Sequence, residues 1–241
     1  MKLLNNKILI TGGATGIGLG LTERFVRENN TVIICGRREE VLKEVTDKFP
    51  SVITKVCDLT IESERIELYD WVAENHSDLN ILVNNAGIMN WINVMDTDFY
   101  QQANNEIATN VMAPIHLTTL FLNLTSLDTI INVTSGLAFV PVSGAAVYCG
   151  TKAFLRSFTL SLRHSLKSKG VEVIELIPPA LDTGISGGKN RNMGYPSVDD
   201  FVESIFRQLK EGKTELTFGT SETRAKANND AIREYYKKLN P

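Results

Sequence analysis

Tyr148 and Lys152 are two residues whose types and spacing point directly to chemistry. They stand four positions apart, so on a helix the phenol and the ammonium would share one face. A free tyrosine has a pKa of about 10, and lowering it to about 7 requires roughly 4 kcal/mol. A lysine charge about 4 Å away supplies that order of energy at an effective dielectric constant of about 20. The spacing therefore predicts that Tyr148 donates a proton to a carbonyl or accepts one from an alcohol.

A serine, Ser135, precedes Tyr148 by thirteen positions and directly follows an apolar run typical of a strand. A small hydroxyl at the carboxyl end of a strand can hold a substrate oxygen. By itself, such a serine is more often a turn residue. With Tyr148 downstream, we interpret Ser135 as the partner of the substrate oxygen.

A glycine-rich turn, Thr11-Gly12-Gly13-Ala14-Thr15-Gly16-Ile17-Gly18, lies between the first predicted strand and the first predicted helix. Its spacing departs from the G-x-G-x-x-G fingerprint. Glycines at such turns are often needed only for backbone geometry. At this position they also let the backbone approach a phosphate, which the helix N-terminus attracts, and we favour that interpretation.

The second predicted strand ends at Cys35-Gly36-Arg37-Arg38, with no carboxylate before Glu39. Dinucleotide sites usually place an acidic residue here for the ribose hydroxyls, whereas an arginine accommodates a 2′-phosphate. Arg37 offers a planar fork to phosphate, so we predict NADP(H) as the cofactor rather than NAD(H). The alternative is that Arg37 and Arg38 are two solvated cations at the start of a helix.

These residues need a scaffold, and short apolar runs alternate with longer helical patterns along the whole chain. The strand candidates are Lys7–Thr11, Thr31–Cys35, Val52–Val56, Leu79–Val83, Thr129–Thr134, Val171–Ile177 and Leu216–Phe218. The helix candidates are Gly16–Glu28, Glu39–Lys48, Ile61–Glu74, Phe99–Leu122, Tyr148–Ser168 and Val198–Lys210. This alternation predicts an α/β fold, a Rossmann-type doubly wound parallel sheet of about seven strands with helices on both faces.

We predict a single domain over residues 1–241, because no linker, composition shift or repeat divides the chain. Residues 178–197 depart from the alternation, and their place after the carboxyl end of a strand predicts a substrate lid. Ser197, three residues before Asp200, predicts a helix start similar to a capping box. The many charges of residues 221–239 predict an exposed C-terminal helical tail.

Several motifs occur together in one order: Thr11-Gly12-x-x-x-Gly16-x-Gly18, Asp58, Asn84-Asn85-Ala86-Gly87, Asn110, Ser135 and Tyr148-x-x-x-Lys152. From about Lys7 to Phe218 the chain thereby resembles the single-domain short-chain dehydrogenases/reductases. Residues 178–183 resemble that family's Pro-Gly segment, with Pro179 in place of the usual glycine. Residues 135–141 and 175–180 look like those of the DltE-type oxidoreductases of Gram-positive bacteria, which implies no known substrate.

The resemblance implies a role for each matched residue. Ser135, Tyr148, Lys152 and Asn110 would be catalytic, with Lys152 on the ribose and Asn110 linking it to water. Asp58 would accept a hydrogen bond from the adenine amino group. The residues implied to bind the cofactor are Gly12, Thr15, Gly16, Ile17, Gly18, Arg37, Arg38, Asp58, Leu59, Asn85, Ala86, Gly87, Tyr148, Lys152, Pro178 and Thr183. The long fourth and fifth helices resemble those that form family dimers and tetramers, which implies a homodimer or homotetramer.

Composition argues against several other classes of protein. The 241 residues are 43% hydrophobic and 22% charged, with a formal net charge of −3. This is typical of a soluble globular protein, and it offers no basic field for nucleic acid or an anionic membrane. Three cysteines without a CxxC pair, and a start too short in apolar residues for a signal peptide, predict a cytoplasmic protein. His76, His116 and His164 lack metal-ligand spacing, so we expect no metal site.

Together these features predict an NADP(H)-dependent oxidoreductase that moves a hydride between nicotinamide and a small-molecule carbonyl or alcohol. Tyr148 would be its general acid/base. A catalytically minor NADP(H)-binding sensor or scaffold is one alternative, and an isomerase or dehydratase on the same scaffold is another. The set of Ser135, Tyr148 and Lys152 favours the oxidoreductase over the sensor, because a binding module needs no proton relay.

Overall fold

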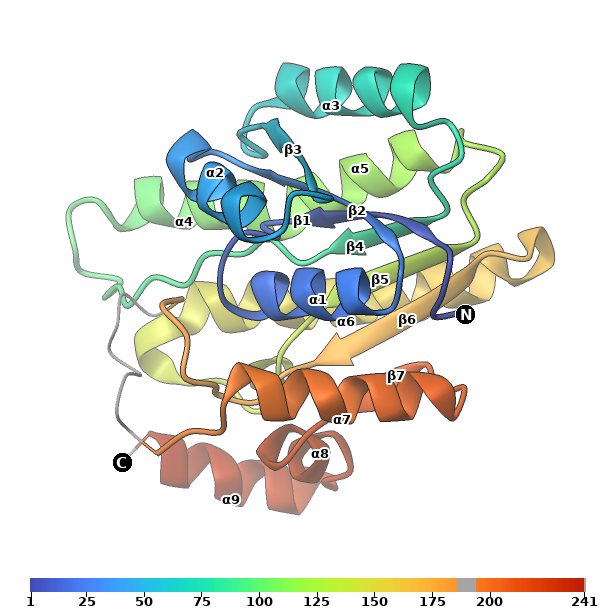
Figure 1. Ribbon diagram of the computed structural model, residues 1–241. Helices are drawn as coiled ribbons and strands as arrows, with labels where there is room; N and C mark the ends of the chain where they lie inside the picture. The colour runs from blue at the N-terminus through green and yellow to red at the C-terminus, as the bar shows by residue number, and fades with distance from the viewer. Residues whose placement is uncertain (186–193, 241) are drawn as a thin grey trace.

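The computed structural model describes residues 1–185 and 194–240. Within those ranges, seven parallel strands form one sheet in the order β3-β2-β1-β4-β5-β6-β7 (Figure 1). The strands are β1 (Lys7–Thr11), β2 (Thr31–Gly36), β3 (Ile53–Val56), β4 (Ile81–Asn84), β5 (Thr129–Val133), β6 (Glu172–Ile177) and β7 (Glu215–Thr217). The strand order reverses between β1 and β4, so the predicted doubly wound sheet is confirmed.

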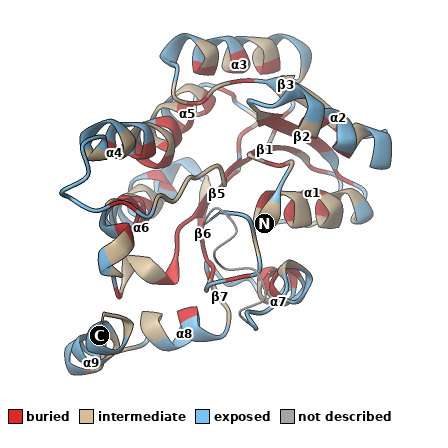
Figure 2. Ribbon diagram, turned by 90° about the vertical axis from the view of Figure 1, so that its left-hand side faces the viewer, coloured by how far each residue is buried: buried red, intermediate tan, exposed pale blue. Residues whose placement is uncertain are grey.

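Helices connect the strands and lie on both faces of the sheet (Figures 1 and 2). The α-helices are α1 (Gly16–Arg27), α2 (Glu39–Lys48), α3 (Glu62–Asn75), α4 (Phe99–Ile107), α5 (Ala113–Phe121), α6 (Ala146–Leu166), α7 (Val198–Lys210), α8 (Thr220–Ala225) and α9 (Asn229–Leu239). The shorter turns are the π-helical η1 (Ala108–Met112) and the 3-10 helices η2 (Gly136–Ala138), η3 (Ser143–Ala145) and η4 (Lys167–Lys169). Among the described residues, no helix combines the length and the apolar character needed to cross a membrane.

The strands are apolar on both sides because helices cover both faces of the sheet. On one face Ile8 of β1 belongs to a core with Phe25 of α1 and Phe206 of α7. On the other face the next residue, Leu9, belongs to a core with Phe121 of α5. Figure 2 shows buried residues concentrated in the strands and on the helix sides that face them. The short apolar runs of the sequence thus form the centre of the fold.

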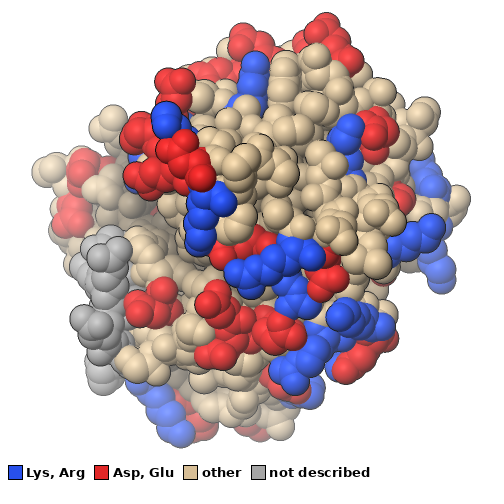
Figure 3. Space-filling model, viewed as in Figure 1, with Lys and Arg blue, Asp and Glu red and all other residues tan. Residues whose placement is uncertain are grey.

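Charges of both signs are interspersed on the face of the molecule shown in Figure 3. Arg24 of α1 forms ion pairs with Glu28 and with Glu203 of α7. Lys48 of α2 pairs with Glu23 of α1 at 2.8 Å. Many of the charges here therefore neutralise one another locally.

The predicted helix from Phe99 to Leu122 is interrupted in the structure by the π-helical turn η1. Pro114 has no N–H to donate to the carbonyl of Asn110, four residues earlier, so the regular hydrogen-bond ladder cannot continue there. Asn110 itself lies within η1 and is fully buried. The interruption falls at a predicted catalytic residue.

The predicted C-terminal tail consists of two helices, α8 and α9, rather than one. Asn228 caps α9 by accepting a hydrogen bond from the Ala231 N–H at 2.9 Å, which starts a new helix after α8. α9 has no buried residue, and the tail contacts the rest of the fold at two points. Ser221 is buried and donates to the Ile177 carbonyl, and the Asn240 side chain contacts Pro141 and Ser143.

The predicted lid, residues 178–197, is described at its two ends only, and residues 186–193 lie outside the described part of the chain. At its C-terminal end, the Ser197 hydroxyl accepts from the Asp200 N–H at 3.0 Å and donates to the Asp200 carboxylate at 2.8 Å. This arrangement starts α7 at Val198, so the predicted helix start is confirmed.

Candidate active site

Three groups of predicted site residues follow strands that are neighbours in the sheet. β1 leads into the glycine-rich turn, β4 into Asn85-Ala86-Gly87, and β5 into Ser135. The carboxyl ends of parallel strands share one edge of a sheet, marked in Figure 1 by the arrowhead of β6. In open α/β sheets, ligands bind at this edge where the strand order reverses.

The glycine-rich turn has the backbone shape that a phosphate site requires. Gly12 has a φ of +64° and Gly16 a φ of +53°, a region that other residues rarely adopt. A Cβ on Gly18 would overlap the carbonyl oxygen of Gly12. Thr15 starts α1 without a side-chain cap, and no acidic residue lies in the first turn, so backbone N–H groups stay available to an anion. The turn therefore fits the phosphates of a dinucleotide.

The start of the predicted lid reaches the same edge. A Cβ on Gly16 would lie 3.7 Å from the Thr183 side chain, so Thr183 borders the phosphate turn. The Pro178 carbonyl accepts a hydrogen bond from the Gly136 N–H at 2.9 Å, which places Pro178 beside Ser135. The structure thus brings Pro178 and Thr183, the two residues of the lid segment that were predicted to bind the cofactor, to the site.

Thr11 and Asn85 tie the end of β1 to the end of β4. The Thr11 hydroxyl accepts hydrogen bonds from the N–H groups of Asn85 and Ala86, each at 3.0 Å. The Asn85 side chain donates to the Thr11 carbonyl at 2.8 Å. A Cβ on Gly12 would lie 3.1 Å from the Ala86 Cα, so the two segments pack backbone to backbone. Asn85 and Ala86 therefore brace the turn against the next strand.

Arg37 and Asp58, predicted for different parts of the cofactor, face each other in the structure. The Arg37 guanidinium lies 3.7 Å from one Asp58 carboxylate oxygen, and the Arg37 side chain is 56% exposed. The other carboxylate oxygen accepts from the Thr60 N–H at 2.9 Å. Arg38 is exposed where α2 begins, whereas Leu59 is buried with its carbonyl bonded to Arg65. An exposed ion pair of this kind contributes little energy, so a phosphate can compete with Asp58 for Arg37.

Ser135 and Tyr148 are buried together, at 7% and 6% exposure. Ser135 follows the last residue of β5 by two positions, and its hydroxyl accepts from the Leu137 N–H at 3.1 Å. Burial raises the pKa of the Tyr148 phenol, and a hydrogen bond with Ser135 opposes that rise. The structure therefore joins the two residues that we predicted to share a substrate oxygen.

Lys152 lies one helical turn after Tyr148 on α6, as predicted. Its Nζ donates to the Val133 carbonyl at 2.8 Å and lies 5.7 Å from the centroid of the Tyr148 ring. Burial lowers the pKa of Lys152 to about 8, and the charge of Glu106 opposes that fall. We expected Lys152 to lower the pKa of Tyr148, but burial raises it, and Lys152 is not among the groups that shift the pKa of the phenol.

Asn110 connects α6 to the segment after β4. Its side-chain oxygen accepts from the Ile88 N–H, and its side-chain nitrogen donates to the Ile88 carbonyl, both at 2.9 Å. The same nitrogen donates to the Thr151 hydroxyl at 3.1 Å. A Cβ on Gly87 would lie 3.3 Å from the Lys152 Nζ and 3.4 Å from the Asn110 oxygen. Asn110, Gly87 and Lys152 therefore meet, as the predicted relay requires.

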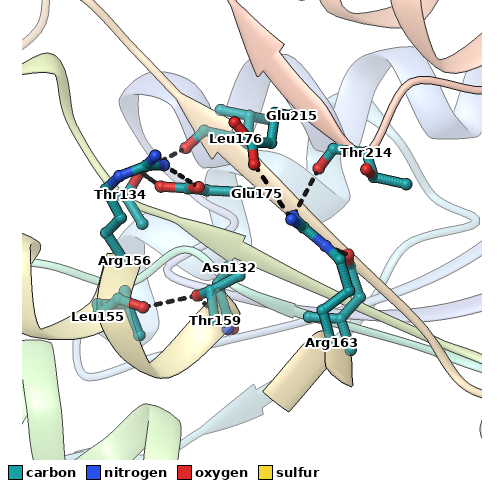
Figure 4. Close-up of polar contacts among 11 residues, drawn as sticks. Asn132, Thr134, Leu155, Arg156, Thr159, Arg163, Glu175, Leu176, Thr214 and Glu215 are labelled. Atoms are coloured by element: carbon teal, nitrogen blue, oxygen red, sulfur yellow. Dashed lines mark hydrogen bonds and ion pairs between the residues drawn. The ribbon is translucent and has the colours of Figure 1, made fainter. Parts of the chain in front are cut away.

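Polar contacts behind the site hold α6 against β5 and β6 (Figure 4). Glu175 of β6 accepts from Thr134 at 2.8 Å and pairs with Arg156 of α6 at 2.5 Å. The Asn132 side chain donates to the Thr159 hydroxyl of α6 at 2.9 Å. These contacts leave little freedom for the helix that carries Tyr148 and Lys152.

One group at the site was missed from the sequence. Glu106 of α4 is fully buried, and its charge acts on Lys152 and Tyr148. The sequence signal that could have identified Glu106 is its spacing from Asn110. Glu106 stands four residues before Asn110, so the two share a helix face. Among the described residues, His, Cys, Asp and Glu form no cluster of three or more able to hold a metal ion.

Comparison with known proteins decides the family. The family model for short chain dehydrogenases matches residues 6–194. The chain belongs to the short-chain dehydrogenase family. This member is 42% identical to the uncharacterized oxidoreductase DltE of Bacillus subtilis (strain 168), over 99% of this chain and 96% of that protein. The predicted family and its DltE-type branch are therefore confirmed, and the chain is an oxidoreductase of this family.

Two further relatives of this short-chain dehydrogenase are informative. It is 33% identical to the serine 3-dehydrogenase of Rhizobium radiobacter, over 75% of this chain and 74% of that protein. A short chain dehydrogenase from Burkholderia cenocepacia J2315, solved in complex with NADP, aligns with a TM-score of 0.84 and 26% identity. That alignment covers 98% of this chain and 99% of the other, so the fold is that of the family throughout.

Proposed function

We propose that this short-chain dehydrogenase interconverts a carbonyl and an alcohol on a small molecule, with NADP(H) as cofactor and Tyr148 as general acid/base. The observation that carries the proposal is that Tyr148 and Ser135 are buried within interaction range of each other, beside a turn that fits phosphates. Lys152 lies on the same helix face, 5.7 Å from the ring centroid. Such a pair is suited to give a proton to a carbonyl oxygen.

The cofactor would lie along the edge where β1 and β4 end. The turn from Gly12 to Gly18 and the uncapped start of α1 would hold its phosphates. Arg37 would hold the 2′-phosphate, and Lys152 the ribose next to the nicotinamide. When bound, the nicotinamide supplies or accepts the hydride.

The chain's own residues would hold and move the proton. Burial raises the pKa of Tyr148, so the phenol is protonated at neutral pH and can act as an acid in carbonyl reduction. Ser135 would orient the substrate oxygen toward the phenol through its hydroxyl. The Lys152 ammonium would stabilise the phenolate that remains, because an opposite charge nearby favours the ionised form. Asn110 holds the Gly87–Ile88 segment in place beside them.

NADP(H) is favoured over NAD(H) by the end of β2. Gly36 leaves space there, since a Cβ on it would meet nothing closer than the Leu42 side chain at 3.8 Å. The next residue is the exposed Arg37, and no carboxylate follows before Glu39. The Burkholderia cenocepacia relative was solved with NADP.

The decisive experiment removes the Tyr148 hydroxyl. Tyr148→Phe should lower the rate of NADPH-dependent carbonyl reduction by about 10²- to 10⁴-fold, because the proton donor is lost. NADPH affinity, measured by fluorescence titration, should change little. The assay would follow NADPH oxidation over a panel of ketones, aldehydes and quinones.

Tyr69→Phe is the matched control, because Tyr69 lies on α3 and packs against Phe121 away from the site. A fully active Tyr148→Phe enzyme contradicts the proposed mechanism. A wild-type protein that binds NADPH but turns over none of the panel supports the sensor or scaffold instead.

A 3-hydroxy acid is a narrower candidate substrate, favoured by Arg224 of α8. A Cβ on Gly136 would lie 3.6 Å from the Arg224 Cδ. The Arg224 side chain therefore packs against Gly136, the residue after Ser135. The acidic groups whose charges act on it are Cys149 and Tyr195, and no described carboxylate pairs with it. A half-buried guanidinium in this position suits a substrate carboxylate. The relative from Rhizobium radiobacter is named for serine, which carries both a hydroxyl and a carboxylate.

We also propose a homodimer or homotetramer formed through α4, η1 and α6. Their outer faces carry Ile107, Met112, Phe154 and Leu160, which are 40%, 51%, 44% and 39% exposed. α4 and α6 pack against each other, so these apolar side chains belong to neighbouring elements. A second copy of the chain would cover them.

The proposed compartment is the cytoplasm. Cys35, Cys57 and Cys149 are free and buried. Reducing compartments keep cysteines as thiols, whereas oxidising compartments favour disulfides.

A further inference from the structure

Glu106 is a buried carboxyl group that the proposed reaction does not use. It lies in α4 with 0% exposure, and its Oε1 accepts a hydrogen bond from the Asn90 backbone N–H at 3.3 Å. Its Oε2 is buried without a hydrogen-bond partner among the described residues. A charged carboxyl group in such a position costs stability, so it needs an explanation.

The titratable groups that face Glu106 come from α6. Its charge acts on Tyr148, Cys149 and Lys152. Lys152 is the one described cation whose charge acts on Glu106 in return. Residues 85–92, on which Asn90 lies, contain no titratable side chain. On α4 itself, the other titratable group, Tyr100, is 77% exposed.

The spacing of residues along α4 and η1, and along α6, explains why Glu106 lies near Lys152 and Tyr148. Glu106 and Asn110 stand four residues apart along α4 and η1, as Tyr148 and Lys152 do along α6. α6 packs against both α4 and η1. Asn110 therefore lies with Lys152, and Glu106 lies one turn away within range of both Lys152 and Tyr148.

Building on the proposed function, we infer that Glu106 is a positioning residue for proton transfer. Its carboxylate keeps Lys152 in the ammonium form and Tyr148 in the protonated form as the pH rises. It does so through its charge, from α4 rather than from the helix that carries the two residues.

The direction of the effect follows from burial and charge. Burial raises the pKa of Glu106 to about 7, against the hydrogen bonds of Asn90 and the charge of Lys152. Burial lowers the pKa of Lys152 to about 8, and the Glu106 charge opposes this. The same negative charge raises the pKa of Tyr148. Removing the carboxylate therefore lowers the pKa of both groups, and the proton-donating form of the site is lost at a lower pH.

The test is Glu106→Gln, which keeps the shape of the side chain and removes its charge. For carbonyl reduction with NADPH, the alkaline limb of kcat/KM should move to lower pH by about 1, which corresponds to about 1.4 kcal/mol of lost charge interaction. Near pH 6 the variant should match the wild type, because Glu106 is already protonated there. Glu106→Asp should restore most of the alkaline limb.

The matched control is Glu175→Gln. Glu175 is also 0% exposed, but it pairs with Arg156 and is absent from the groups that act on Lys152. Its removal should leave the alkaline limb in place, with folding of each variant checked by circular dichroism. An unmoved limb in folded Glu106→Gln, or an equal movement in both variants, overturns the inference.

A second measurement is independent of turnover. In carbon-13 carboxyl spectra, a signal missing from Glu106→Gln should titrate near pH 7, and Lys152→Met should move that titration to higher pH. If the pKa of Glu106 is the same in Lys152→Met as in the wild type, the inference is overturned. These outcomes are separate from the proposed function, which fails if Tyr148→Phe stays active and survives if only the Glu106 tests fail.

Discussion

Tyr148, Lys152 and Glu106 are each less than one-tenth exposed, and this burial governs their acid–base behaviour. Burial opposes charge, so it raises the pKa of the phenol and of the carboxyl group and lowers that of the ammonium. Arg37, in contrast, is 56% exposed and pairs only loosely with Asp58. At the residue scale, the candidate site has a buried end, where we propose proton transfer, and an exposed end, where we propose recognition of phosphate.

Arg37→Gln tests the exposed end. The variant should weaken NADPH binding roughly tenfold or more, because a charge-assisted hydrogen bond contributes about 1.5–3 kcal/mol. NADH binding should change little, since NADH lacks the 2′-phosphate. Fluorescence titration of both cofactors measures the two effects.

Arg27→Gln is the control, because Arg27 is 69% exposed and lies at the far end of α1. An equal loss of affinity for NADPH and NADH in Arg37→Gln contradicts the assignment. So does a wild-type protein that binds NADH as tightly as NADPH.

At the scale of elements, two irregular features position the site. Pro114 interrupts the fourth helix, and the resulting π-helical turn carries Asn110 to the Ile88 backbone. α8 docks at the carboxyl ends of β5 and β6 through the Ser221 hydroxyl, which donates to the Ile177 carbonyl at 2.6 Å. The docked helix brings Arg224 next to Gly136.

Arg224→Gln tests what α8 contributes. For a substrate with a carboxylate, such as a 3-hydroxy acid, the variant should raise KM roughly tenfold or more, because a charge-assisted contact is lost. For a neutral alcohol of similar size, KM should stay within about twofold, since Arg224 makes no such contact with it. Steady-state kinetics with both substrates measures the difference.

Arg233→Gln is the matched control, because Arg233 lies on α9 and is 77% exposed. Equal changes in KM for the acid and for the neutral alcohol speak against an anion site at Arg224.

At the scale of the whole molecule, the apolar face of α4, η1 and α6 predicts self-association. Sedimentation velocity at micromolar concentration should show a dimer or a tetramer. Phe154→Glu should shift the distribution toward monomer, because a charge would be buried in the contact.

Met95→Glu is the control for this face, since Met95 is 85% exposed in the loop before α4. A wild-type protein that sediments only as a monomer contradicts the proposed homo-oligomer.

The sequence by itself determined the sheet, and it predicted the phosphate turn and the set of Ser135, Tyr148 and Lys152. These depend on local periodicity and on short spacings, such as the four residues between Tyr148 and Lys152, which hold in any helix. Ser197 likewise predicted the start of α7, because a cap acts within one turn.

Tertiary structure alone decided which polar groups became buried together. Glu106 is one of 28 acidic residues, and only the packing of α4 against α6 removes it from water beside Lys152. Tertiary packing also brings Arg224 to Gly136, through the docking of α8. It likewise buries Tyr148 and so raises the pKa of its phenol. Burial depends on neighbours distant in the chain, so a local pattern can indicate the helix face of such a residue but does not determine its burial or its pKa.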